Sequence, residues 1–290
     1  MHTIASAVLH GVAVLFAGNL VWGLLLAPLN LKVLTIVPWA AVPMAAYLWL
    51  YWQYIGGRLG PAATAERRRE SLRANPLTRE VWALAIVSGL TGFGALLVLT
   101  AVMARLMPMP ASAPIVFPAA MPQATAAVLL TMASVVAGVT EEAAFRGYMQ
   151  GPLEQRYGLA TAIAVNGAAF GLLHFPNHPE AVVQMLPYYI AVAAVYGGLT
   201  WATNSILPAV ALHVGGDIWS LGRLWITGRP EWQRTENPPP LVWVSGPDAS
   251  FLWACALLVA FTAATIALYG YLQRVTTRLA ASSIAPSLLR

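Results

Sequence analysis

Eight hydrophobic stretches along the chain are long enough to cross a lipid bilayer as helices, for which about 20 apolar residues are needed. The composition agrees, because 59% of the residues are hydrophobic and only 9% are charged, against roughly 25% charged residues in soluble domains. We predict an all-α fold, a polytopic membrane helix bundle of about eight transmembrane helices with a polar intramembrane cavity, forming a single membrane domain over residues 1–290. The predicted helices cover about 4–28, 32–55, 80–106, 124–150, 158–175, 182–202, 205–226 and 250–273.

The arginines predict how these helices are oriented. Six lie in segment 57–79 and three in segment 274–290, whereas Lys32 is the only lysine. Since positively charged loops stay cytoplasmic, we predict that both termini are cytoplasmic and that segment 223–249 lies outside. The lysine-poor, arginine- and alanine-rich usage favours a bacterial cytoplasmic membrane. The net charge of +5 is attributed to contacts with anionic lipid, and no nucleic-acid partner is predicted.

Three polar clusters lie within the predicted helices. The first consists of Glu141, Glu142 and Arg146 in the fourth predicted helix. Ionisable groups at such a depth are costly and usually functional. Glu142 and Arg146 are four residues apart on one helix face and are expected to pair, which leaves Glu141 without an obvious cation. A desolvated carboxylate of this kind suits a general base. This cluster alone is equally compatible with the alternative, a purely structural ion-pair network that holds helices together.

The other two clusters lie on the fifth and seventh predicted helices. Asn166, Phe170 and His174 follow one another at four-residue spacing and therefore line one side of the fifth helix, which Pro176 is expected to end. On the seventh helix, four-residue spacing gives His213 and the acidic residue of its HVGGD motif a common face. Taken alone, each cluster is more simply explained as structural. The cluster on the seventh helix would then be a hydrogen-bonded pair beside a close helix contact at Gly215 and Gly216.

The distance of each cluster from the end of its helix indicates that the three clusters lie close together in the membrane. If the fourth and fifth helices turn near Tyr157 and Gly158, Glu141 and His174 each lie about 16 residues, or roughly 24 Å, from that corner. If the sixth and seventh helices turn near Asn204, His213 lies roughly 13 Å from the corner. If the corner near Tyr157 and Gly158 protrudes from the membrane by about 10 Å, all three clusters lie at the same depth in the bilayer.

In this order the clusters resemble the CAAX prenyl endopeptidase and bacteriocin-processing family of intramembrane proteases, also called the CPBP or Abi family. Each motif is weak by itself, and the resemblance spans a motif-bearing core at about 124–220. It implies a helix bundle with a conical polar cavity and an endopeptidase of the metal-independent glutamate type, acting on a membrane protein or peptide substrate. The motifs are Glu141-Glu142-x-x-x-Arg146, Phe170-x-x-x-His174 and His213-x-x-x-Asp217.

The resemblance also implies a role for each matched residue. Glu141 would activate a water with help from His174, and His213 and Asp217 would stabilise the oxyanion of the tetrahedral intermediate. Eukaryotic members have asparagine where this chain has Asp217, and an ionised aspartate would repel an oxyanion. Asp217 is therefore protonated, orients His213 or belongs to a cation site, in that order of preference. Roles in holding or tuning the site are assigned to Glu142, Arg146, Phe170 and Asn166.

No cofactor is predicted. Cys255 is the only cysteine, so an intrachain disulfide and a cysteine-based zinc site are excluded. His174, His213 and the two glutamates are nevertheless plausible zinc ligands, and zinc remains the alternative. Two other functions also stay open: a proton-coupled transporter, which typically shows internal repeats, and a non-catalytic scaffold or immunity protein. The sequence specifies neither the substrate, prenylated or not, nor the oligomeric state.

Overall fold

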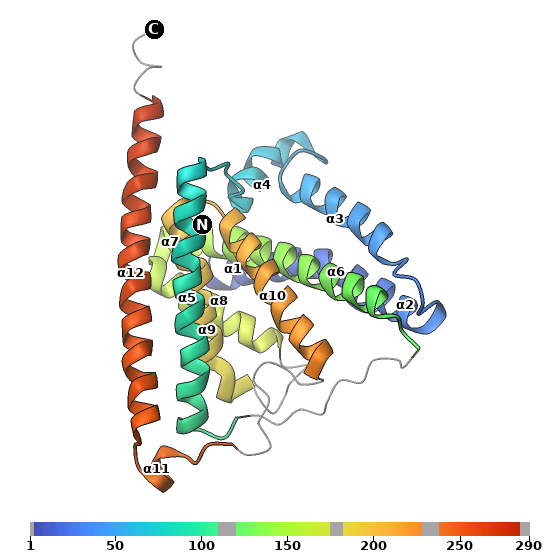
Figure 1. Ribbon diagram of the computed structural model, residues 1–290. Coiled ribbons are helices and arrows are strands. Elements are labelled where there is room, and N and C mark those ends of the chain that lie inside the picture. The colour runs from blue at the N-terminus through green and yellow to red at the C-terminus, as the bar shows by residue number, and fades with distance from the viewer. Residues whose placement is uncertain (1–2, 110–119, 175–181, 228–237, 285–290) are drawn as a thin grey trace. The chain divides into compact units, whose positions relative to one another are not determined.

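A computed structural model describes residues 3–109, 120–174, 182–227 and 238–284 (Figure 1). Every regular element within these residues is helical, with two π-helical segments (η1, η3) and one 3-10 segment (η2). The elements are α1 (Ile4–Leu20), η1 (Val21–Leu26), α2 (Ala27–Val33), α3 (Ala41–Ile55), η2 (Ala62–Thr64), α4 (Ala65–Leu72), α5 (Arg79–Leu106), α6 (Gln123–Glu141), η3 (Glu142–Met149), α7 (Gln150–Tyr157), α8 (Leu159–Leu173), α9 (Val182–Thr203), α10 (Leu207–Thr227), α11 (Val242–Ser245) and α12 (Ala249–Ile284).

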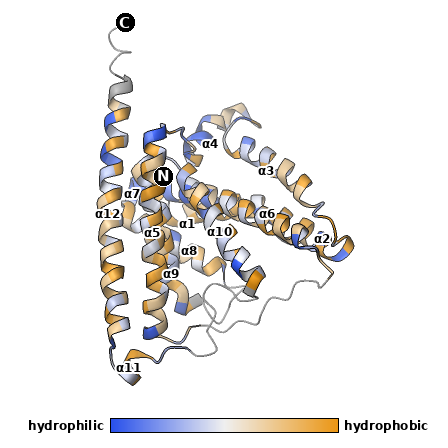
Figure 2. Cartoon of the chain, viewed as in Figure 1, coloured by the Kyte–Doolittle hydropathy of each residue, from blue (hydrophilic) through white to orange (hydrophobic). Residues whose placement is uncertain are grey.

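Five of the eight predicted membrane helices are long and apolar enough to cross a bilayer within the described residues. Figure 2 shows α5 and α12 to be hydrophobic along most of their length, with hydrophilic residues toward their ends. The other three predicted stretches are also helical. However, α3 and α8 have 15 residues each, or about 22 Å, and α10 carries His213, Asp217 and Arg223. The five spans are Ile4–Val33, Arg79–Leu106, Gln123–Tyr157, Val183–Thr203 and Ala249–Leu279.

Both predicted corners are confirmed. Helix α7 ends at Tyr157, and Gly158, with a φ of 82°, separates it from α8. This left-handed backbone favours glycine. The second corner lies at Asn204, whose φ is 49°, in a conformation that asparagine tolerates better than most residues. Asn75 donates from its amide to the Asn204 carbonyl at 2.6 Å and so fixes this corner. Pro176, the predicted helix stop, lies outside the described residues.

Contacts divide the chain into two compact units, each built from segments that are distant in sequence. The first unit takes its residues from Met1–Ala74, Ala111–Ala162 and Val210–Gln233, and the second from Asn75–Pro110, Ile163–Ala209 and Arg234–Arg290. The first unit therefore contains α1 to α4, α6, η3, α7 and most of α10. The second contains α5, most of α8, α9, α11 and α12. The single domain predicted from the sequence stays a prediction.

Hydrogen bonds from side chains to backbone carbonyls join the helices of the first unit. Tyr51 of α3 donates to the carbonyl of Val14 in α1 at 3.1 Å, and Tyr148 of η3 donates to that of Ile55 at 2.7 Å. Because α1 also packs along η3, the polar segment after Glu141 is enclosed by protein. This enclosure is what allows charged side chains at this place in an otherwise apolar helix.

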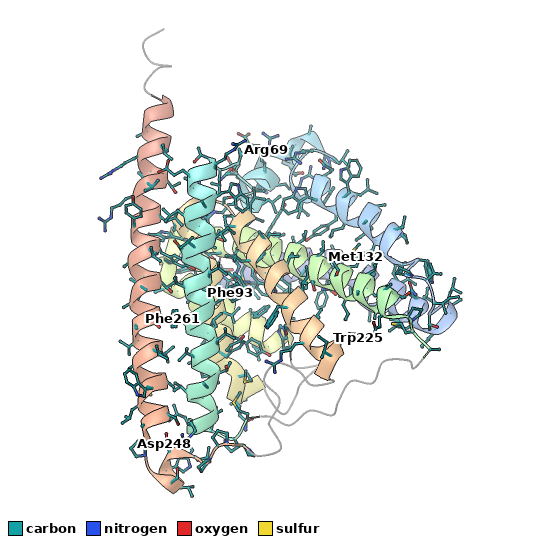
Figure 3. The ribbon with its side chains drawn as sticks, in the orientation of Figure 1. Arg69, Phe93, Met132, Trp225, Asp248 and Phe261 are labelled. Atoms are coloured by element: carbon teal, nitrogen blue, oxygen red, sulfur yellow. The ribbon has the colours of Figure 1, made fainter. Side chains whose placement is uncertain are left out.

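The second unit is organised around the pairing of α5 with α12, which run side by side (Figure 1). The Phe261 ring, labelled on α12 in Figure 3, packs against the backbone of α5 at Gly94. Tyr269 of α12 donates to the Val195 carbonyl of α9 at 2.9 Å. At the start of α12, Asp248 forms an ion pair with Arg105 at 2.8 Å. This unit supplies the scaffold that carries His174.

Candidate active site

The first cluster lies where α6 passes into the π-helical segment η3, between Glu141 and Glu142. Such wider turns are rare and occur frequently at functional sites. Glu142 and Arg146 are both fully buried, and the Arg146 guanidinium donates to Glu142 Oε1 at 3.1 Å. The predicted pairing of these two residues is thereby confirmed, and it balances one charge in a water-poor environment.

His213 of α10 adds an imidazole to this ion pair. Its Nδ1 lies 2.7 Å from Glu142 Oε1, the oxygen that also contacts Arg146. Since a carboxylate only accepts hydrogen bonds, Nδ1 carries the hydrogen and donates it. Glu142 therefore fixes the ring orientation and directs Nε2 to the opposite side.

Two more carboxylates lie on the Nε2 side of His213. Glu141 Oε2 is 3.7 Å from Nε2 and Asp217 Oδ2 is 3.6 Å from it. Side-chain exposure rises from 0% at Glu142 and 8% at His213 to 16% at Glu141 and 31% at Asp217. The buried end of the cluster is thus structural, whereas its accessible end presents an imidazole edge and two carboxylates to an incoming molecule.

A close contact at Gly138 brings α10 against α6, which cross in Figure 1. A Cβ at Gly138 would lie 2.5 Å from Val214 Cγ2 and 3.0 Å from the Val214 nitrogen. Small residues permit such approaches between membrane helices. The HVGGD motif predicted the close approach at Gly215 and Gly216. That expectation is wrong for Gly215, because no described atom lies within 4 Å of a Cβ built there.

Replacing Gly138 by leucine is expected to abolish activity at the site, because the side chain would displace α10 and move His213 away from Glu141. Overpacking of this kind typically also costs about 1–3 kcal/mol of stability. Gly215→Ala is the matched control on α10. It is expected to keep activity and to raise helix stability by up to about 1 kcal/mol. Thermal melting and the reaction rate at the site, measured on both variants, check the prediction, and a fully active Gly138→Leu would contradict it.

The His174 cluster belongs to the second unit. The His174 Nδ1 lies 2.8 Å from the carbonyl oxygen of Phe170, to which it donates, so Nε2 is the basic nitrogen of the neutral ring. Phe170 and His174 also contact each other edge to face at 4.6 Å between ring centroids, which confirms that they share one side of the helix. Asn166, one turn earlier, is buried.

Tyr189 of α9 is a member of this cluster that no sequence motif predicted. Its ring stacks on His174 at 4.9 Å between centroids and contacts Phe170 edge to face at 5.5 Å. Tyr189 is buried, and no motif spacing links α9 to α8, so only packing reveals it. His174 is thereby held by one hydrogen bond and two aromatic rings. Glu141 and His174 belong to different units, and their predicted meeting stays a prediction.

Within the described residues, no group of three or more histidine, cysteine, aspartate or glutamate side chains has the arrangement of a metal site. Comparison with known proteins adds one match: residues 123–219 match the family model described as type II CAAX prenyl endopeptidase Rce1-like. No curated protein and no solved structure matches the chain. The matched segment begins at α6 and ends two residues after Asp217, so it contains all three clusters and supports the family that they resemble.

Proposed function

Since this integral membrane protein carries a domain of the CAAX prenyl endopeptidase family at residues 123–219, we propose that it hydrolyses a peptide bond of a membrane protein or peptide, using water activated by Glu141. The observation that carries the proposal is the arrangement around His213. A buried Arg146–Glu142 pair fixes one ring nitrogen, and the other faces the partly exposed Glu141 carboxylate. Carboxylate and imidazole side chains are among the groups that most often serve as general bases and acids in hydrolysis.

In the proposed reaction, Glu141 takes a proton from a water molecule, and the resulting hydroxide attacks the carbonyl carbon of the scissile peptide bond. The carbonyl oxygen becomes an oxyanion. When the tetrahedral intermediate collapses, its carbon–nitrogen bond breaks, and the leaving amine receives the proton that Glu141 had accepted. The same carboxylate thus serves first as base and then as acid.

Stabilisation of the oxyanion is assigned to His213. In its protonated form the ring donates Nδ1–H to Glu142 and keeps Nε2–H for the oxyanion, at the accessible end of the cluster. Such preorganised donors are worth about 3–4 kcal/mol of barrier in comparable sites. Asp217 lies 3.6 Å from the same Nε2. We therefore assign it to orienting His213, and a proton on the aspartate would remove its repulsion of the oxyanion.

His174 is proposed to assist Glu141 through Nε2, since its Nδ1 donates to the Phe170 carbonyl. The proposal includes eight membrane-embedded helices around a polar cavity, with α3, α8 and α10 completing the five long spans, and both termini in the cytoplasm. Prenylated peptides, which the family name suggests, are the first substrate class to test. A bacterial cytoplasmic membrane is the proposed location.

The test is a comparison of membrane proteomes from cells that carry either the wild-type protein or Glu141→Gln at equal abundance. New protein termini should appear only with the wild type, and synthetic peptides that span those cleavage sites, prenylated or not, should be cut by the purified wild-type protein. Loss of a cellular phenotype without any change in termini would favour the scaffold. A phenotype that survives Glu141→Gln would also favour it.

Proteolysis by the purified protein is expected to be insensitive to chelators, because the proposed base and oxyanion donor are side chains. The measurement is peptide cleavage before and after incubation with 1,10-phenanthroline and EDTA, followed by dialysis. A thermolysin sample, treated in parallel, verifies that the chelators work. Activity that disappears and returns on addition of zinc would replace the glutamate mechanism with a metal-assisted one.

A further inference from the structure

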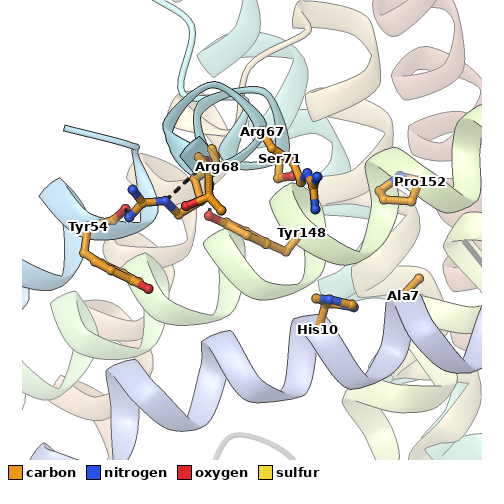
Figure 4. Close-up of a pocket in the computed structure, with 9 residues that line it drawn as sticks. Ala7, His10, Tyr54, Arg67, Arg68, Ser71, Tyr148 and Pro152 are labelled. Carbon is orange, nitrogen blue, oxygen red and sulfur yellow. Dashed lines mark hydrogen bonds between the residues drawn. The ribbon is translucent and has the colours of Figure 1, made fainter. Parts of the chain in front are cut away.

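A second polar site lies in the first unit, in a cavity of about 260 Å³ (Figure 4). None of the candidate active-site residues lines it. The volume is just below the roughly 300 Å³ at which pockets for drug-sized ligands begin, so it suits a small polar group. Its lining residues are Ala7, His10, Tyr54, Thr64, Arg67, Arg68, Ser71, Tyr148 and Pro152.

The lining is positively charged and contains no carboxylate. Arg68 is buried, and its guanidinium stacks over the Tyr54 ring at 4.4 Å. It donates only to neutral acceptors, the backbone carbonyls of Tyr54, Leu59, Pro61 and Thr64, at 2.6–3.4 Å. These bonds hold the side chain rigidly and leave its positive charge without a counter-ion among the described residues. A fixed and uncompensated cation attracts an anion into the cavity.

Arg67 supplies a second cation at the cavity. Its side chain is exposed and forms no hydrogen bond or ion pair within the described part of the chain. Figure 4 shows it on α4 next to Ser71, with His10 of α1 on the other side of the cavity. Glu66 and Glu70 also lie on α4, but neither lines the cavity. An anion would therefore meet two guanidinium groups, an imidazole and the Ser71 hydroxyl, whereas the Thr64 and Tyr148 hydroxyls donate to backbone carbonyls.

The cavity lies beside the start of the first apolar span, where a membrane surface is expected. Ala7 and His10 belong to the first two turns of the apolar span that starts at Ile4. The opposite wall is α4, the most polar helix of the chain, with three consecutive arginines. Guanidinium groups at this level are the usual partners of phosphate groups, to which they present several donors at once.

We propose that this cavity binds a phosphate group, carried by an anionic phospholipid headgroup or by a soluble phosphate compound. Arg67 closes over the phosphate from α4, and the buried Arg68 supplies a permanent positive potential behind it. Bound phosphate links α1 to α4. Because Ser71 and the neighbouring Leu72 pack against the backbone of η3 at Gly147, the site also lies next to the segment that carries Glu142 and Arg146. The inference does not depend on the proposed protease activity.

The test uses the full chain in phosphatidylcholine nanodiscs with and without phosphatidylglycerol. Native mass spectrometry after detergent release measures how much phosphatidylglycerol the protein retains. Arg67→Gln should reduce retention about fivefold, since one juxtamembrane arginine contributes about 1 kcal/mol toward anionic lipid. Arg67→Lys should retain most of it. The control is Arg69→Gln, which removes the same charge from the same helix (Figure 3) at a residue that does not line the cavity.

A second arm separates the two sources of phosphate. Inorganic phosphate is added to protein in a neutral detergent, and thermal melting is followed for the wild type and for Arg67→Gln. A rise in melting temperature that depends on Arg67 assigns the site to soluble phosphate. Arg67-dependent lipid retention without this rise assigns it to a headgroup. The proposal is overturned if neither probe binds, or if Arg67→Gln and Arg69→Gln, both folded by their melting curves, behave alike.

Discussion

Replacing Glu141 by glutamine is expected to lower the rate of peptide hydrolysis by about 10²–10⁴-fold, the range that a positioned general base contributes. Glutamine keeps the shape of the side chain but cannot accept the proton of the attacking water. The Glu141 carboxylate is partly exposed and lies 3.7 Å from His213, too far for a strong hydrogen bond. Its replacement should therefore leave the melting temperature almost unchanged. Single-turnover cleavage of an identified peptide measures the rate.

The adjacent glutamate provides the sharpest comparison. Glu142→Gln should lower both activity and stability, because it removes the negative charge that balances Arg146 and leaves a single neutral amide oxygen to accept from both Arg146 and His213. Glu154→Gln is the control for a carboxylate on the same continuous helix, since Glu154 pairs with Arg73 outside the site. A wild-type rate in Glu141→Gln, or equal loss of stability in both glutamate variants, would remove Glu141 from the proposed role.

Spacing along one helix was sufficient to predict the local pairs of the site. Four-residue spacing predicted that Glu142 pairs with Arg146, that Phe170 contacts His174 and that His213 lies near Asp217, and the structure has all three contacts. These predictions succeed because neighbouring turns of a helix fix side-chain distances almost independently of tertiary structure. Corners at Gly158 and Asn204 were equally predictable, since few residues tolerate a positive φ.

Contacts between helices were predictable only in part. Counting residues from the corners placed His213 at the level of Glu141, but it could not show that Nδ1 of the ring contacts Glu142. That contact depends on the π-helical turn after Glu141 and on the close approach of Val214 to Gly138. Neither has a sequence signature. Stacking of Tyr189 on His174 was missed for the same reason, because side-chain packing between helices depends on shape complementarity and not on a periodic pattern.

Substitution of Arg146 by methionine tests whether the buried charges serve stability or positioning. The change leaves Glu142 buried with His213 as its remaining partner, and breaking a buried ion pair typically costs about 3–5 kcal/mol. A large fall in the midpoint of unfolding by SDS in mixed micelles is the expected result. Arg73→Met is the matched control. It breaks the Arg73–Glu154 pair, whose side chains are 12% and 20% exposed, and should cost about 1 kcal/mol or less.

The double variant Glu142→Leu with Arg146→Met separates the two roles. Replacing both members of a buried pair by apolar side chains is often neutral, so stability should return toward that of the wild type. Activity should remain lost, because His213 no longer has the acceptor that holds its Nδ1 and directs its Nε2 toward Glu141. A double variant that is stable and active would show that Glu142 does not position His213. A double variant that is as unstable as Arg146→Met alone would show that the loss of stability comes from lost packing and not from an unbalanced charge.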